Sequence, residues 1–263
     1  KLITRKPDLD SLSFDQTFSS GNQNLFSSKT SANIPFAENY AAKLAYFYED
    51  VDGFVENDGP GGGFGDRQSD GFRFDFRARV TEALLLDYAY DESNIKYYNY
   101  TAQAMYPRLP GEGGLISLIG AQASQYVEYG TNKFSSLATS VALEPTDTTI
   151  EGHSLNIDWS IDDETTFRSI TAWREVDDKS YVDFASGATA EFRIDFNSYV
   201  LYKNDSNNSV TLPLVKPDQH QQQFTQEFQL LGKIGSSIDY LVGLYYFEEE
   251  ATEDSFPAHH IFN

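Results

Sequence analysis

Residues 71–80 alternate between apolar and charged side chains. Phe72, Phe74 and Phe76 occupy even positions, whereas three arginines and an aspartate occupy odd ones. A period of two places successive side chains on opposite faces of a β-strand. The segment is therefore predicted to be a strand with one apolar face, and that face contacts either the core of a soluble sandwich or the lipid around a barrel.

The same alternation, read together with turn-forming residues, predicts about nine strands. They fall at residues 11–18, 25–34, 41–54, 71–80, 84–98, 153–161, 165–177, 223–232 and 238–250. Helical periodicity is weak throughout, and only residues 120–129 fit a short helix.

The predicted connections alternate in length along the chain. Short turns are expected at residues 35–40, 81–83, 162–164 and 233–237, whereas long loops are expected at 55–70, 99–152 and 178–222. Only the connection at 19–24 breaks this alternation. Short turns on one side and long loops on the other are typical of transmembrane β-barrels. The predicted fold class is therefore all-β, an antiparallel up-and-down transmembrane β-barrel.

In such a barrel the charged row of 71–80 needs a wet environment. Arg73, Asp75, Arg77 and Arg79 are expected to face the lumen or a plug, and the phenylalanines to face lipid, because charged residues on a lipid face are destabilising. The tyrosines that bracket the strands are predicted to form interfacial girdles. They are Tyr40, Tyr46, Tyr48, Tyr88, Tyr90, Tyr97, Tyr98, Tyr240, Tyr245 and Tyr246.

The composition of the chain argues against several classes of function. The chain has 40 acidic and 19 basic residues and a formal net charge of −21, which argues against nucleic acid as a partner. It has no cysteine, so disulfides, thiolate zinc sites and a cysteine nucleophile are excluded for these residues. The longest apolar runs are too short to span a bilayer as a helix.

The sequence contains no strong catalytic, phosphate-binding or metal-binding motif. The glycine-rich stretch 59–65 lacks the Lys-Ser/Thr ending of a phosphate-binding loop, and a flexible extracellular loop is expected instead. His259 and His260 are adjacent, so on a strand they point to opposite sides and do not chelate one ion, while His153 and His220 are isolated along the sequence. No catalytic residue, metal site or cofactor is predicted, and the chain is not expected to be an enzyme.

Ligand contacts are expected from aromatic residues at the outer strand ends and in the long loops, since aromatic rings stack on bulky amphipathic ligands. The candidates are Tyr97, Tyr98, Tyr100, Tyr106, Tyr126 and Tyr129.

Several stretches resemble the TonB-dependent outer-membrane receptors of Gram-negative bacteria. They are "LITRKPD" at 2–8, "AAKLAYFYEDVDGFVEND" from 41, "GDRQSDGFRFDFRARVTEALLLDYAYDES" from 65, "HSLNIDWSIDDETTFRSITAWREVD" from 153 and "QQFTQEFQLLGKIGSSIDYLVGLYYFEEEA" from 222. The resemblance implies a barrel of about 22 strands filled by an N-terminal plug. It also implies uptake of an iron-siderophore complex or another scarce nutrient, energised through TonB.

On this basis residues 1–8 are expected to join the plug to the barrel, and residues 9–263 to form part of the barrel wall. Nine strands are fewer than half of the family's number, so the chain is expected to be a fragment. The expected partners are outer-membrane lipid, TonB through the plug region, and a small-molecule substrate such as a ferric siderophore. Two alternatives remain open, namely a passive porin-like or surface-adhesive barrel, and a soluble ligand-binding β-sandwich.

Overall fold

The computed structural model describes residues 5–100, 136–137, 143–183, 192–195, 200–203, 214–215, 217–235 and 237–254. Every regular element in this part of the chain is a β-strand. Within the same residues, no helix has the length and hydropathy needed to cross a membrane. The short helix predicted at 120–129 lies outside the described residues.

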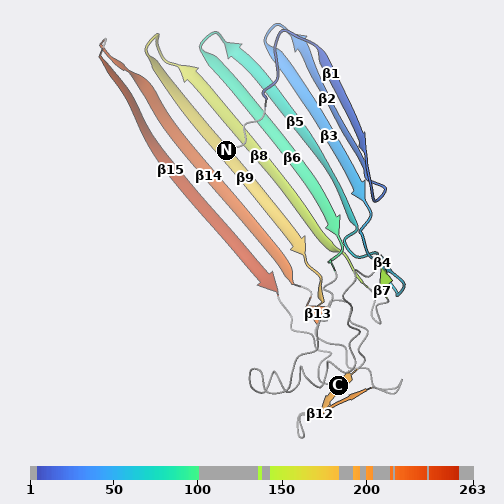
Figure 1. Ribbon diagram of the computed structural model, residues 1–263. Coiled ribbons are helices and arrows are strands. Elements are labelled where there is room, and N and C mark those ends of the chain that lie inside the picture. Colours follow the sequence, from blue (N-terminus) through green and yellow to red (C-terminus); the bar gives the residue numbers. More distant parts are fainter. Residues whose placement is uncertain are drawn as a thin grey trace.

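Nine long strands form one sheet in which each strand pairs antiparallel with its neighbours, in the order β1-β2-β3-β5-β6-β8-β9-β14-β15 (Figure 1). The predicted all-β, up-and-down fold with nine main strands is confirmed, and the sheet is open, with β1 and β15 at its edges. The strands are β1 Ser13–Ser20, β2 Phe26–Ala37, β3 Tyr40–Val51, β5 Arg67–Thr81, β6 Leu84–Tyr97, β8 Thr146–Ser160, β9 Thr165–Lys179, β14 Asp218–Ile234 and β15 Ile238–Asp254.

Three of these strands begin earlier than the hydropathy pattern predicts. β5 begins at Arg67, β8 at Thr146 and β14 at Asp218, whereas the hydropathy pattern predicts starts at 71, 153 and 223. The added residues are mostly polar, so they carry no apolar alternation, yet their backbone groups continue the ladder with the neighbouring strands. The long connections are correspondingly shorter than expected and run over 52–66, 98–145 and 180–217.

All four tight turns lie at one end of the sheet, and the strand ends that the remaining connections join lie at the other end (Figure 1). The turns comprise residues 38–39, 82–83, 161–164 and 235–237. The connection of residues 21–25 is short but lies at the loop end.

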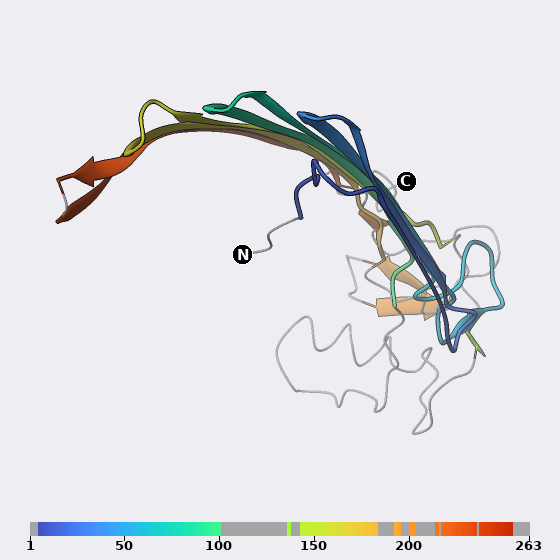
Figure 2. The same ribbon diagram turned by 90° about the horizontal axis from the view of Figure 1, so that it is seen from above.

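The sheet is strongly curved, and the N-terminal segment lies on its concave side (Figure 2). The pairing register assigns the faces, because residues directly opposite each other on neighbouring strands share one face. Arg77 pairs with Asp87, and Asp87 contacts Lys6 of the N-terminal segment, so the charged row of β5 belongs to the concave face.

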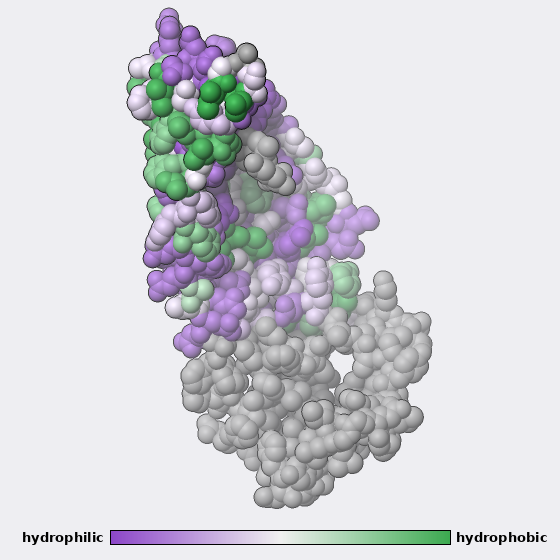
Figure 3. Space-filling view, turned by 90° about the vertical axis from the view of Figure 1, so that its left-hand side faces the viewer, coloured by the Kyte–Doolittle hydropathy of each residue, from purple (hydrophilic) through white to green (hydrophobic). Residues whose placement is uncertain are grey.

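The convex face carries a band of apolar side chains. It includes Phe72, Leu44 and Leu244, which are 41%, 40% and 73% exposed, although they lie in the middle of long strands. Seen from the β15 edge, hydrophobic residues gather in a band below the turn tips, and a hydrophilic zone follows toward the loop end (Figure 3). Along β15 the same change occurs after Phe247, where three glutamates begin.

Short strands lie at the loop end. β4 (Glu56–Asn57) pairs in parallel with β7 (Ser136–Leu137). Two further antiparallel pairs join β10 (Val182–Asp183) to β13 (Leu214–Val215) and β11 (Phe192–Asp195) to β12 (Val200–Lys203).

Candidate functional site

The concave face carries an ion-pair network in the middle of the sheet. Arg73 donates two hydrogen bonds to Asp75, at 2.9 and 2.7 Å, and a third to Asp91 on β6 at 3.1 Å. The side chain of Asp75 is only 4% exposed. A buried carboxylate requires such charge-assisted partners, because its desolvation is otherwise strongly unfavourable.

A second pair lies closer to the turns. The Nε and Nη2 groups of Arg77 donate to both carboxylate oxygens of Asp87, at 2.7 and 2.9 Å. Lys6 approaches the same carboxylate, with its Nζ 3.8 Å from Oδ2. Asp87 therefore joins the wall of the sheet to the N-terminal segment.

The network extends across strand β8 at the position of a glycine. Arg174 on β9 reaches over β8 to Asp91 on β6, with its Nη2 2.9 Å from Oδ2. The residue between them is Gly152, where an added Cβ would lie 3.2 Å from Nη2 of Arg174. The missing side chain gives the guanidinium room to lie flat across the strand.

The arginine row predicted to face the lumen thus lies entirely on the concave face. Arg73, Asp75 and Arg77 take part in the network, and Arg79 is exposed near the turn, where its backbone N–H donates to Asn39. Asp91, Arg174 and Gly152 were not singled out from the sequence. The matched spacing of charges on neighbouring strands becomes visible only once the register is known.

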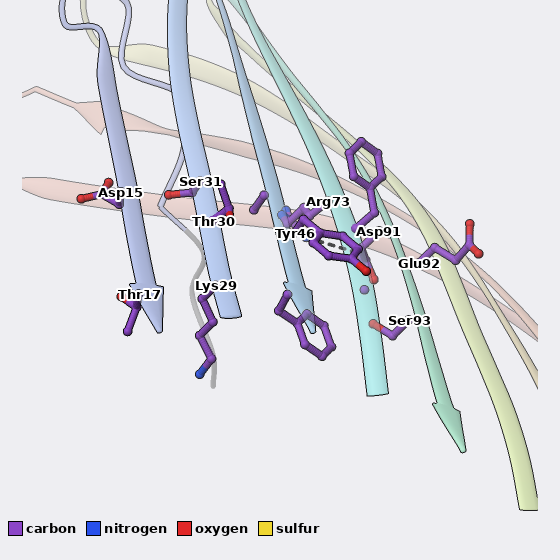
Figure 4. Close-up of a pocket in the computed structure, with 14 residues that line it drawn as sticks. Asp15, Thr17, Lys29, Thr30, Ser31, Tyr46, Arg73, Asp91, Glu92 and Ser93 are labelled. Carbon is purple, nitrogen blue, oxygen red and sulfur yellow. Dashed lines mark hydrogen bonds and ion pairs between the residues drawn. The ribbon is translucent and has the colours of Figure 1, made fainter. Parts of the chain in front are cut away.

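Beside the network the concave face is hollowed over β1, β2, β3, β5 and β6 (Figure 4). The hollow has a volume of about 650 Å³. Lys29, Asp15 and Ser31 contribute polar groups from the first two strands, and Arg73 and Asp91 lie at its far side. Arg73 and Asp91 are paired with each other at this edge, and the polar groups along the hollow suit contact with another hydrated protein surface or with a polar ligand.

The N-terminal segment is held against the concave face by Asn33 of β2. Asn33 accepts a hydrogen bond from the backbone N–H of Asp8 at 2.9 Å and donates to the carbonyls of Asp8 and Ser11 at 2.9 and 2.6 Å. The backbone N–H of Asp10 and the hydroxyl of Ser11 donate to the Asp8 carboxylate and lower its pKa. Pro7 is fully buried. The segment is therefore docked by specific contacts.

At the loop end, the glycine-rich stretch, which is expected to be a flexible loop, lies against a small core. Val55, Phe64, Leu143 and Tyr181 are buried together, with Tyr98 packed against them. The two oxygens of Asp66 accept hydrogen bonds from the backbone N–H groups of Gly53 and Gly63, at 2.8 and 2.9 Å. An added Cβ at Gly62 would lie 2.4 Å from the ring of Tyr98, so this close approach requires glycine.

The predicted ligand-contacting tyrosines have different environments. Tyr98 packs in the loop core, whereas Tyr97 is exposed at the end of β6. Tyr100 is 65% exposed and stacks on Phe54, with ring centroids 5.6 Å apart. Tyr106, Tyr126 and Tyr129 lie outside the described residues.

The girdle prediction needs correction at three of its ten tyrosines. Tyr97 pairs with Arg67, and Tyr245 pairs with Glu227, so both share the concave face. Tyr98 belongs to the loop core. The remaining seven lie on the convex face by register, although sequence position alone does not distinguish the two sets.

No family model matches the sequence, and no curated protein matches it either. Solved structures, in contrast, match nearly the whole chain. The ferric yersiniabactin uptake receptor FyuA from Yersinia pestis aligns at 13% identity with a TM-score of 0.64, covering 96% of this chain and 33% of the receptor. The ferric-catecholate import receptor Fiu from E. coli, in its closed form, aligns at 17% identity with a TM-score of 0.63, covering 99% and 35%. The siderophore receptor PiuA from Acinetobacter baumannii aligns at 10% identity with a TM-score of 0.59, covering 96% and 32%.

These matches define the class of fold. The chain has the fold of a β-barrel wall, and the three solved structures named above are described as an uptake receptor, an import receptor and a siderophore receptor. The resemblance to TonB-dependent receptors is thereby confirmed for the fold, and the matching proteins are uptake and import receptors, not enzymes. The chain spans about a third of the length of these receptors.

Proposed function

We propose that this chain forms part of the barrel of an outer-membrane receptor that imports a ferric siderophore or a similar scarce nutrient. The observation that carries the proposal is a curved up-and-down sheet with a charged concave face and an apolar convex face, which matches siderophore receptors over 96% or more of the chain. A soluble sandwich would bury its apolar face in a protein core. A lipid-facing band, in contrast, is exposed in the isolated chain because only lipid would cover it.

In this proposal the apolar band of the convex face contacts lipid of a Gram-negative outer membrane. The tight turns then face the periplasm, and the connections 52–66, 98–145 and 180–217 face the exterior. The extension of β5, β8 and β14 by polar residues suits strands that project beyond the bilayer surface.

The concave face then borders the lumen. Arg73, Asp75, Arg77 and Arg79 contact water and a plug, and residues 1–8 join that plug to the barrel. The contacts of Lys6 with Asp87 and of Asp8 with Asn33 support such a junction, because they fix the segment inside the curve of the sheet. TonB would deliver energy through the plug region.

The cargo is proposed to meet aromatic side chains at the loop end. Tyr97, Tyr98, Tyr100, Tyr106, Tyr126 and Tyr129 are the candidates. Among those described, the exposed ring of Tyr100 on Phe54 offers a stacking surface, whereas Tyr98 is engaged in packing.

The test is uptake by whole cells. A strain that lacks the gene is complemented with the full-length protein, and ⁵⁵Fe accumulation is measured for a panel of ferric siderophores, with and without TonB. We expect one siderophore class to be taken up only when both the receptor and TonB are present.

Two results would contradict the proposal. Entry of small solutes independent of TonB would indicate a passive pore. A protein that fractionates as a soluble species without detergent would exclude the membrane location altogether.

A further inference from the structure

Three side chains with metal-binding atoms converge on the convex face, beyond the apolar band. Glu175 and Asp177 are two residues apart on β9 and share one face, and His220 on β14 lies directly opposite Asp177 in the register. Nδ1 of His220 lies 2.8 Å from Oδ1 of Asp177 and 3.9 Å from Oε1 of Glu175. One ligand atom from each residue falls within 4.8 Å of the others.

The two distances from His220 are close to those between ligand atoms in a tetrahedral metal site. Zinc holds nitrogen and oxygen ligands at about 2.0–2.1 Å, which puts neighbouring ligand atoms about 3.3 Å apart. The contact between His220 and Asp177 would need to open by about half an ångström, and that between His220 and Glu175 to close by a similar amount. The side chains of His220, Asp177 and Glu175 are 37%, 45% and 19% exposed, respectively, so rotations of this size meet little obstruction.

The surroundings favour a cation. Glu250 of β15 adds a further negative charge that acts electrostatically on His220. Gln222 donates to Oε2 of Glu175 at 3.1 Å, leaving Oε1 directed toward His220. A hydrogen bond to the second oxygen is how outer-sphere residues orient a ligating carboxylate.

We propose that Glu175, Asp177 and His220 bind a divalent transition-metal ion such as Zn²⁺. The imidazole selects such an ion over Mg²⁺ or Ca²⁺, which prefer sites built from oxygen alone. The ion links β9 to β14 where these strands enter and leave the connection 180–217. Metal binding therefore stabilises the base of that connection, which joins two adjacent strands.

The experiment is a calorimetric titration of the full-length protein in detergent with ZnCl₂. The protein is prepared without a histidine tag, because a tag would itself bind Zn²⁺. We expect saturable binding that an excess of Mg²⁺ does not displace. Asp177→Asn and His220→Gln should each weaken it by about tenfold or more.

Two control variants separate this site from the general attraction of cations to an acidic chain. Glu248→Gln removes a convex-face carboxylate outside the cluster, and the pair His259→Gln with His260→Gln removes the adjacent histidines near the C-terminal end. Both controls should leave the affinity for Zn²⁺ unchanged.

The proposal is overturned if Zn²⁺ binds no more tightly than Mg²⁺, or if binding survives His220→Gln and Asp177→Asn. It is also overturned if only the His259 and His260 variant removes the binding. Heat-modifiable gel mobility identifies folded protein, and should one variant fail to fold, the other decides the result.

Discussion

Arg77 and Asp87 form a two-bond ion pair on the concave face, at N···O distances of 2.7 and 2.9 Å. Asp87 is 8% exposed, and its other cationic neighbour, Lys6, is more distant at 3.8 Å. Removing one partner of such a pair strongly destabilises the protein, because the remaining buried charge loses its compensation.

Arg77→Met is therefore expected to lower the free energy of unfolding by about 3 kcal/mol. The measurement is urea unfolding of the full-length protein in detergent, followed by tryptophan fluorescence. Arg79→Met is the matched control, since Arg79 is an exposed arginine of the same strand and face. Equal effects of the two substitutions would show that the enclosed pair is unimportant.

Within one element, β8 presents adjacent residues to opposite environments. Leu155 shares the convex face with Tyr88, its partner on β6, whereas Ser154 shares the concave face with Ala89. Both side chains are half-buried, so their exposure alone does not separate them. What differs is the medium that each face is proposed to contact.

Leu155→Arg is expected to destabilise the protein in lipid bilayers by about 2–4 kcal/mol, the cost of an arginine near the bilayer midplane. Ser154→Arg, one position away, should cost clearly less because its guanidinium can reach water in the lumen. Reversible folding into phosphatidylcholine vesicles supplies both free energies. If the two positions respond alike, the assignment of the convex face to lipid is wrong.

For the whole molecule, the proposed orientation across the membrane follows from the segregation of turns and loops at opposite ends of the sheet. The sequence given contains no cysteine, so single introduced thiols report one position each. Asp58 in the connection 52–66 and Asp163 in the turn 161–164 are both exposed acidic residues. They form a matched pair at the two ends.

Asp58→Cys is expected to react with a membrane-impermeant maleimide on intact cells, and Asp163→Cys only after the outer membrane is permeabilised. Labelling is quantified by gel shift against total protein. Labelling of Asp163→Cys alone on intact cells would invert the proposed topology, and labelling of neither position on intact cells would argue against surface exposure.

Much of the sheet could be predicted from the sequence because alternation is a local property. Each long strand carries enough apolar residues at a period of two to be located, and the turns carry their own residue preferences. The predicted strands are too short at the polar ends of β5, β8 and β14, where both faces are largely hydrophilic. Backbone pairing continues there without any hydropathy signal, and so only the structure fixes the strand ends.

The alternation of apolar and polar residues was sufficient to predict an all-β fold and the charged row from Arg73 to Arg79, because both are local properties of the chain. Tertiary structure alone decided which residues meet across strands, because register depends on contacts between segments far apart in the chain. It places Arg174 over Gly152 against Asp91, separated by 83 positions in sequence. It also brings His220, isolated along the chain, opposite Asp177, 43 positions away, and so creates the cluster from which a metal site is inferred.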